Sequence, residues 1–177
     1  MDGEKIEDGL QEIELVRYAD SRGEFQNIHI KNNDEGLLGE AVNFVMDNVS
    51  KSKKGVLRGL HYQKHKPQGK LVTVLQGAIY DVAVDIREGS STYGKWSGVE
   101  ITDRGSNQVW VPPGFAHGFL ALEEDTIVHY KVTEYYEPSD QYVIAWNDPE
   151  LAIEWPKLSE DFILSERDQQ GLSFSAI

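Results

Sequence analysis

The chain contains no cysteine, which excludes disulfides, thiolate metal sites and a cysteine nucleophile. No apolar run approaches the roughly 20 residues that a membrane-spanning helix requires. The N-terminal stretch MDGEKIEDGLQEIEL is acidic and lacks the apolar centre of a secretory signal peptide. These absences predict a cytoplasmic protein with no membrane partner.

Positive charge is also scarce, because 17 Lys and Arg residues stand against 30 Asp and Glu residues and give a net charge of −13. Such a surface repels nucleic acid and anionic membranes, so neither is expected as a partner. It would also repel an anionic substrate unless the binding site gathers its own cations. The cations that stand among apolar residues, Arg58, Lys70 and Arg167, are therefore the most informative ones.

Glycine and proline punctuate the middle of the chain about every eight to twelve residues, which is typical of an all-β sandwich or barrel. The clearest strand is AIYDVAVDI at 78–86, where alternate side chains fall on opposite faces. Other strands are expected at 70–77, 96–102, 107–112, 118–122, 126–136 and 142–147. We therefore predict an all-β fold, a two-sheet jelly-roll sandwich or barrel with a few short helices.

The 177 residues are expected to form one domain, which is long enough to bury a core. An N-terminal arm is expected over about residues 1–14, and a C-terminal helical segment over about residues 157–177. In that segment, Ser165 and Asp168 of LSERD have the spacing of a short helix-capping turn. The stretch NNDEGLLGEAV at 32–42 is expected to hold another irregular helix.

One histidine motif points to a particular kind of barrel. In VPPGFAHGFLAL, His117 follows a Pro-x-Gly-x-x-His pattern, which resembles the second motif of the cupin superfamily of small jelly-roll barrels. The glycine permits a tight turn, after which the histidine projects into the mouth of the barrel. The alternative for His117 is a buried histidine that is hydrogen-bonded beside the Pro-Gly turn.

A second histidine, His61 in GLHYQ, stands where metal-binding cupins carry two histidines one residue apart and then a glutamate. Here Tyr62 and Gln63 follow it, and one histidine without a nearby carboxylate is a poor start for a metal site. We therefore expect a barrel without metal or other cofactor. His61 is then free to act as a base, because imidazole titrates near neutral pH.

Six segments resemble the dTDP-4-dehydrorhamnose 3,5-epimerase family, in the same order and over roughly residues 15–170. They are KSKKGVLRGLHYQ, QGKLVTVLQGAIYDVAVDIR, WVPPGFAHGFLAL, YKVTEYYEP, WNDPELAIEWP and LSERD. The resemblance implies a cofactor-independent isomerase that inverts C3 and C5 of dTDP-4-dehydro-6-deoxy-D-glucose and gives dTDP-4-dehydro-L-rhamnose. It also implies a homodimer whose N-terminal segments complete each other's sites.

The resemblance also implies a role for each matching residue. His61 corresponds to the general base, and Asp168 to the carboxylate that orients it. Tyr130 corresponds to the proton donor on the other face of the sugar, and Lys70 to the cation beside the C4 oxygen. The implied substrate contacts are Arg22, Asn27, Met46, Asp47, Asn48, Arg58, His117, Tyr136, Gln141 and Arg167.

Among these contacts, Tyr136 would stack on the thymine, and Arg22 and Asn27 would come from the partner subunit. The chemistry favours the other residue types without the resemblance. A 4-keto group acidifies the hydrogens at C3 and C5, and their removal leaves an enolate whose charge an ammonium group at O4 stabilises. Inversion then requires an acid on the face opposite the base. Arginine side chains suit the diphosphate, because their forked donors match phosphate oxygens.

Three parts of the site depart from the family pattern. Met46 and Val49 in MDNVS replace a glutamine and a histidine, while Asn27 and Gln141 each replace a glutamate. Each such change can cost about 1–3 kcal/mol of binding for a matching ligand. A 3-only or 5-only epimerase of a related nucleotide 4-keto sugar is therefore the alternative. A metal-dependent cupin and a non-catalytic sugar-nucleotide binder are further alternatives, which the missing histidine pair and the complete acid–base set oppose.

Overall fold

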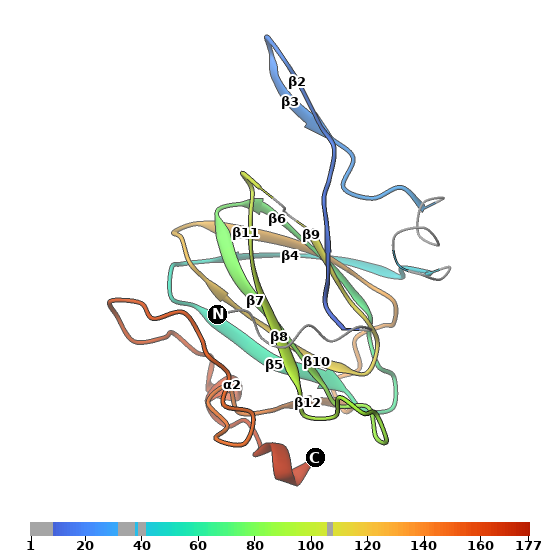
Figure 1. Cartoon of the computed structure of the whole chain (residues 1–177), viewed down its shortest axis with the longest axis vertical. Coiled ribbons are helices and arrows are strands. Elements are labelled where there is room, and N and C mark those ends of the chain that lie inside the picture. Colours follow the sequence, from blue (N-terminus) through green and yellow to red (C-terminus); the bar gives the residue numbers. More distant parts are fainter. Residues whose placement is uncertain (1–8, 32–37, 39–41, 106–107) are drawn as a thin grey trace.

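The computed structural model describes residues 9–31, 38, 42–105 and 108–177, and most of its regular structure is β-strand. One five-stranded sheet has the order β1 (Gln11–Ile13), β9 (Gln108–Val111), β6 (Lys70–Gln76), β11 (Thr126–Val132) and β4 (Met46–Ser52). The second has the order β12 (Gln141–Val143), β5 (Leu57–Gln63), β10 (Phe115–Ala121), β7 (Ala78–Asp85) and β8 (Trp96–Thr102). Their strand pairs are antiparallel, and the two sheets face each other as a sandwich (Figure 1).

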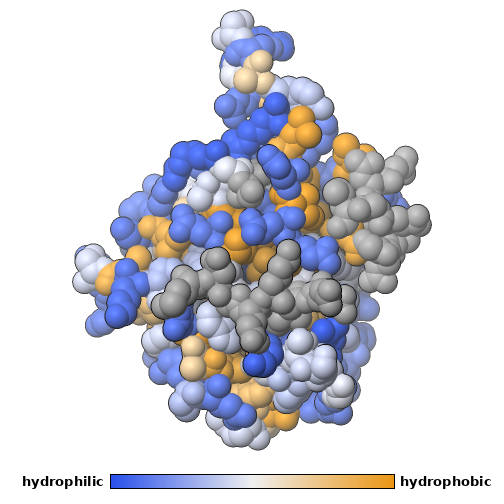
Figure 2. Space-filling view, viewed as in Figure 1, coloured by the Kyte–Doolittle hydropathy of each residue, from blue (hydrophilic) through white to orange (hydrophobic). Residues whose placement is uncertain are grey.

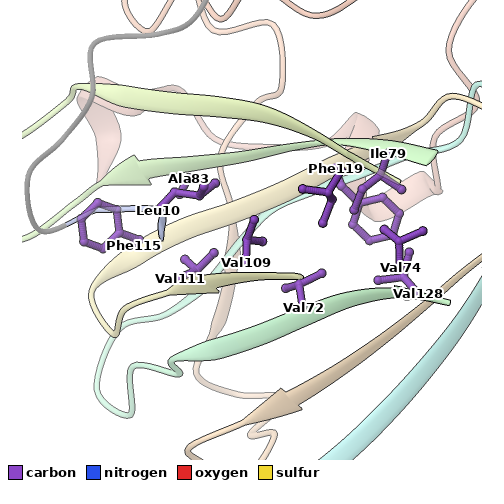
Figure 3. Close-up of a cluster of buried hydrophobic side chains, with 11 residues drawn as sticks. Leu10, Val72, Val74, Ile79, Ala83, Val109, Val111, Phe115, Phe119 and Val128 are labelled. Atoms are coloured by element: carbon purple, nitrogen blue, oxygen red, sulfur yellow. The ribbon is translucent and has the colours of Figure 1, made fainter. Parts of the chain in front are cut away.

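The interior between the sheets is filled mainly by aliphatic and aromatic side chains that alternate along the strands (Figure 3). The buried cluster consists of Leu10, Val72, Val74, Ile79, Ala83, Ile101, Val109, Val111, Phe115, Phe119 and Val128. Strand β7 alternates as predicted, because Ile79 and Ala83 face this cluster while Val82 and Val84 face the opposite side. Its Asp81 shares the inner face and has no exposed surface, so a charged group lies inside the sandwich.

A second cluster covers the outer face of the second sheet, where Val82 and Val84 pack with Leu151 and Phe174 of the C-terminal segment. This segment contains two short helices, α2 (Glu166–Gln169) and the 3-10 helix η2 (Phe174–Ala176). The hydroxyl of Ser165 accepts a hydrogen bond from the Asp168 backbone N–H at 3.1 Å, which confirms the predicted capping turn. No helix in the described part of the chain is long and apolar enough to cross a membrane.

The predicted all-β sandwich with few helices is confirmed, although some element bounds differ. The strand expected over 126–136 ends at Val132, because the following residues leave the sheet and form a loop that side-chain amides hold in place. Of the arm expected at 1–14, only residues 9–14 are described, and they include β1. Most of the helix expected at 32–42 lies outside the described residues.

A third, two-stranded sheet forms a hairpin from β2 (Arg17–Asp20) and β3 (Gly23–Gln26), which projects away from the sandwich (Figure 1). Its Tyr18 and Phe25 rings lie 6.4 Å apart and are 59% and 62% exposed. Hydrophobic surface also gathers where the hairpin leaves the sandwich (Figure 2). This hairpin therefore presents apolar side chains that the described chain does not cover.

Candidate functional site

A cavity of about 390 Å³ lies between the two sheets, a volume that suits a small-molecule site. Nine residues selected from the sequence line it: Met46, Asn48, Arg58, His61, Lys70, His117, Tyr130, Tyr136 and Gln141. They come from six strands and one loop, so the fold brings together residues as far apart in the sequence as Met46 and Gln141. Two other selected residues, Asp168 and Arg167 of α2, contact members of this set.

His61 is held by Asp168, whose Oδ1 lies 2.5 Å from His61 Nε2. Asp168 also accepts a hydrogen bond from the Ser165 hydroxyl at 2.8 Å, and its side chain is only 5% exposed. Burial raises the pKa of the Asp168 carboxyl, but the hydrogen bonds from His61 and Ser165 outweigh it and hold the pKa below its ordinary value. An ionised Asp168 can only accept a hydrogen bond, so in neutral His61 the proton lies on Nε2 and the free lone pair on Nδ1.

A bulge in β5 decides which way His61 points. Arg58 and His61 are three residues apart, and in a regular strand an odd spacing would place them on opposite faces. The register against β10 shifts here, because His61 pairs with His117 while Arg58 pairs with Phe119. Two residues of β5, Gly59 and Leu60, thus lie opposite the single Gly118 of β10, which is the signature of a β-bulge. Both Arg58 and His61 consequently line the cavity.

Glycine is required inside this bulge. Gly59 has a φ of +126°, and a Cβ there would lie 2.6 Å from the Gly118 Cα and 2.8 Å from the His117 carbonyl oxygen. Both values are shorter than any ordinary contact, so β5 and β10 approach closely only because neither Gly59 nor Gly118 has a side chain. The backbone N–H of Gly59 also helps to lower the pKa of the Asp168 carboxyl, which connects the bulge to the carboxylate beside His61.

Tyr130 lines the cavity from the opposite sheet, since it belongs to β11 whereas His61 belongs to β5. Burial raises the pKa of the Tyr130 phenol, and the charge of Arg58 offsets part of this effect. The phenol therefore stays protonated at neutral pH. The cavity thus has an imidazole on one wall and a protonated phenol on the other.

Lys70 begins β6 and is 8% exposed, so its ammonium group lies inside the cavity wall. Burial lowers its pKa from 10.5 to about 8, while the negative charge of Asp81 acts in the opposite direction. At neutral pH most molecules therefore keep a charged ammonium at this position. A desolvated cation interacts strongly with any negative charge that develops beside it.

His117 forms a second histidine–aspartate pair, because its Nε2 lies 2.9 Å from both carboxyl oxygens of Asp81. The two pairs are neighbours, since His117 lies opposite His61 in the β10–β5 register. They differ in access, because the His61 side chain is 29% exposed and the His117 side chain only 9%. The imidazole of His61 is therefore the one better placed to reach a bound ligand.

Arg167 joins the loop that carries Tyr136 to the second sheet. Its Nη1 donates to the Tyr136 hydroxyl at 3.2 Å and to Gln141 Oε1 at 3.0 Å, and its Nη2 donates to the Gln141 carbonyl at 2.8 Å. Arg58 is anchored differently, through Nε to the Ser52 hydroxyl at 3.2 Å. The cavity therefore has cations at two places besides Lys70.

Three selected residues lie away from the cavity. Asp47 alternates with Met46 and Asn48 along β4, so its carboxylate faces the other side and accepts hydrogen bonds from His129 and Lys131, each at 2.8 Å. Arg22 lies in the turn between β2 and β3, where Asp20 accepts from its Nε at 3.0 Å. Asn27 lines a separate cavity at the outer face of the first sheet.

The sequence reading missed several residues of the cavity wall: Ser50, Tyr62, Gln63, Gln68, Val72, Phe119 and Val132. Strand alternation identifies some of them afterwards, because Ser50 follows Asn48 and Val132 follows Tyr130 at the two-residue period. In the described residues 9–31, 38, 42–105 and 108–177, no group of three or more His, Cys, Asp or Glu side chains is placed to hold a metal ion. The carboxylates at the site pair with imidazoles instead.

Comparisons with known proteins agree on one family. The family model described as dTDP-4-dehydrorhamnose 3,5-epimerase matches residues 5–176. A dTDP-4-dehydrorhamnose 3,5-epimerase of Methanothermobacter thermautotrophicus is 48% identical over 166 residues, which cover 92% of this chain and 88% of the relative. One from Pseudomonas aeruginosa is 46% identical over 158 residues, which cover 89% of this chain and 87% of the relative.

The fold is also similar to solved structures of such enzymes. The crystal structure of dTDP-6-deoxy-D-glucose-3,5-epimerase from Legionella pneumophila, in complex with dTDP-4-keto-L-rhamnose, superposes with a TM-score of 0.94. It is 46% identical, and the match covers 99% of this chain and 92% of that one.

Proposed function

Because the chain belongs to the dTDP-4-dehydrorhamnose 3,5-epimerase family, we propose that His61 and Tyr130 carry out its proton transfers from opposite faces of the sugar. The chain is an epimerase, an isomerase that inverts C3 and C5 of dTDP-4-dehydro-6-deoxy-D-glucose and gives dTDP-4-dehydro-L-rhamnose. The activity and the family that the sequence resemblance implied are thus confirmed.

The observation that supports these roles best is the placement of acid and base on different sheets. His61 projects from the second sheet and Tyr130 from the first, and both line the same cavity. A sugar ring between them would present opposite faces to the two side chains. Inversion of a carbon needs this arrangement, because the proton must return on the face opposite to the one from which it left.

The reaction begins when Nδ1 of neutral His61 removes the hydrogen at C3 or C5, and Asp168 stabilises the imidazolium that results. The electrons of the broken C–H bond pass to the C4 carbonyl and form an enolate. The buried Lys70 ammonium stabilises the charge on O4. The Tyr130 hydroxyl then donates a proton to the other face of the same carbon, and the ketone is restored.

The diphosphate explains the remaining cations. Arg58 lines the cavity and Arg167 hydrogen-bonds to Tyr136 and Gln141 of its wall, and the planar donors of both suit phosphate oxygens. The chain as a whole carries a charge of −13, so a nucleotide sugar is attracted only where cations outnumber carboxylates locally. The thymine would stack on Tyr136, a residue that is 47% exposed and lines the cavity.

A homodimer completes the proposal. Arg22 lies in the turn of the projecting hairpin with a side chain that is 88% exposed, and Asn27 lies outside the cavity. In a dimer, the hairpin could place Arg22 against the site of a second copy and bury Tyr18 and Phe25. Sedimentation should give the mass of two chains, and Phe25→Lys should shift it toward one chain with loss of activity. A monomer with full activity would contradict this arrangement.

The proton-transfer roles are tested by following solvent deuterium into dTDP-4-dehydro-6-deoxy-D-glucose. The wild-type protein should introduce label at both C3 and C5. His61→Ala should reduce exchange about 10²- to 10⁴-fold while dTDP affinity stays nearly unchanged. His65→Ala is the matched control, because His65 also pairs with an aspartate, Asp140 at 2.6 Å, but lies outside the cavity.

Tyr130→Phe separates the acid from the base. It should slow net inversion more than it slows loss of the substrate hydrogen, since His61 remains intact. Equal effects on both steps would assign the donor role to another group. Label at only one carbon in the wild-type protein would instead show a single-site epimerase.

A further inference from the structure

Gln63 lines the cavity but has no part in the proton transfers described above. It ends β5, two residues after His61, so both side chains project from the same face of the strand. Only 4% of Gln63 is exposed, which is unusual for a polar side chain beside an open cavity. A buried amide of this kind normally has its donors and acceptor satisfied, and its partners indicate what it does.

The three partners of Gln63 are all backbone groups in two loops. Its Nε2 donates to the carbonyl of Lys66 at 2.8 Å and to the carbonyl of Tyr135 at 3.2 Å. Its Oε1 accepts from the backbone N–H of Glu137 at 2.8 Å. One side chain therefore ties the loop after β5 to the loop between β11 and β12.

Two of these bonds lie on either side of Tyr136. The Tyr135 carbonyl belongs to the peptide group before Tyr136, and the Glu137 N–H belongs to the peptide group after it. The φ and ψ angles of Tyr136 are the rotations between these two planes. Because the same amide holds both planes, Gln63 fixes the backbone conformation from which the Tyr136 ring projects.

The other end of the ring is also held, because Arg167 Nη1 donates to the Tyr136 hydroxyl at 3.2 Å. Tyr136 as a whole is 47% exposed and lines the cavity, so its side chain stays accessible although both ends are tethered. We propose that Gln63 is a positioning residue that presents the Tyr136 ring to the nucleobase. This inference rests on the proposed function, in which Tyr136 stacks on the thymine.

The expected loss of dTDP affinity follows from the conformational entropy that is lost when the backbone of one residue is ordered. Without Gln63, the Tyr136 backbone would have to be fixed by the nucleotide itself, and this cost would appear as weaker binding. Ordering one residue reduces an equilibrium constant by about 5- to 30-fold. We therefore expect dTDP to bind about 5- to 30-fold more weakly to Gln63→Met, and the KM for the nucleotide sugar to rise similarly.

The experiment measures dTDP affinity by calorimetry, together with kcat for exchange of the substrate hydrogens. Gln63→Met preserves side-chain size but makes none of the three bonds, and kcat at saturation should stay within about twofold of wild type because binding alone is affected. Gln63→Glu keeps the acceptor for the Glu137 N–H and loses both donors. If Gln63→Met does not fold, the dTDP affinity and kcat of Gln63→Glu test the inference in its place. Gln76→Met is the matched control, since Gln76 donates to the Asp125 carbonyl at 3.1 Å outside the cavity.

A double-mutant cycle with Tyr136→Ala identifies the path of the effect. If Gln63 acts through Tyr136, Gln63→Met should cost no further dTDP affinity once the ring is gone. An equal cost in both backgrounds, or a fall in kcat as large as the fall in affinity, would overturn the inference. So would unchanged dTDP affinity in Gln63→Met.

The same measurements distinguish this inference from the proposed function. A wild-type protein that does not bind dTDP, or a Tyr136→Ala variant that binds it normally, would remove the stacking role and the inference together. A Tyr136→Ala variant that binds weakly beside a normal Gln63→Met variant would remove only the role of Gln63.

Discussion

Replacing Lys70 with methionine should abolish catalysis and at the same time stabilise the protein. Lys70 is almost fully buried, and burial of a charged amine is unfavourable unless a partner compensates for it. Asp81 supplies part of that compensation, but the pKa of Lys70 still lies at about 8. Folding therefore works against the ammonium form that the proposed stabilisation of the enolate requires.

The magnitude follows from the difference in proton affinity between the folded and unfolded chain. The pKa falls from 10.5 to about 8 on folding, and each tenfold change in proton affinity corresponds to about 1.4 kcal/mol. The charged Lys70 therefore costs about 3 kcal/mol of folding stability at neutral pH. Lys70→Met removes this cost and keeps a side chain of similar length, so its free energy of unfolding at pH 7 should rise by up to about 3 kcal/mol.

The pH dependence of the free energy of unfolding tests independently whether Lys70 destabilises the folded chain. Between pH 8 and pH 10.5 the unfolded chain binds more protons at this lysine than the folded chain does. Wild-type stability should therefore rise with pH across this window, relative to Lys70→Met. The advantage of the variant should be largest below pH 8 and should disappear near pH 10.5.

Urea unfolding of both proteins at pH 7 and pH 10 measures these differences. Lys157→Met serves as the control, because Lys157 is exposed and lies outside the cavity, and it should leave stability almost unchanged. If Lys70→Met is less stable than wild type at pH 7, or if the difference does not depend on pH, the argument from burial is refuted. Loss of deuterium exchange in the more stable variant would show that Lys70 is kept for chemistry and not for folding.

Three other predictions follow from the site. Asp168→Asn should reduce exchange about 10²- to 10⁴-fold with dTDP affinity retained in calorimetry, because the imidazolium loses its counter-charge. Gly59→Ala should lower the free energy of unfolding, measured in urea, by about 3 kcal/mol or more, since its Cβ would lie 2.6 Å from Gly118 Cα. Gly23→Ala should lose less stability, because Gly23 also has a positive φ but no atom within 4 Å of the added Cβ. The value of kcat/KM, which reports the free enzyme, should fall above about pH 8 as Lys70 loses its proton; a flat kcat/KM profile to pH 10 would exclude Lys70 as the enolate's partner.

Much of the fold could be predicted from the sequence, because strand alternation is a local property. The AIYDVAVDI stretch shows it, since the inner and outer faces of β7 match the alternation of its apolar residues. The strand predicted over 126–136 shows the limit. Its apolar and aromatic residues continue past Val132, but long-range bonds from Gln63 and Gln68 draw the later ones into a loop.

The cavity could be predicted only in part, because its residues meet through sheet pairing and not through spacing along the chain. Alternation explains only afterwards why Met46 and Asn48 line the cavity while Asp47, which the resemblance had also selected, turns its carboxylate toward His129. No local pattern could indicate that Asp81 would lie beside His117, 36 positions away. The resemblance to a known family selected most of these residues, whereas Gln63 was visible only once its three hydrogen bonds were known.

The pairing of Arg58 with His61 in one strand shows how a local irregularity creates the site. A regular strand would expose one of them to the cavity and turn the other toward the outer face. The bulge at Gly59 adds one residue on the β5 side, so Arg58 and the proposed base His61 both face the cavity, and the Gly59 N–H helps to lower the pKa of Asp168. A single glycine therefore sets the direction in which the His61 side chain points and helps to keep its neighbour Asp168 ionised. This explains why a β-prone stretch includes a glycine between its two polar residues.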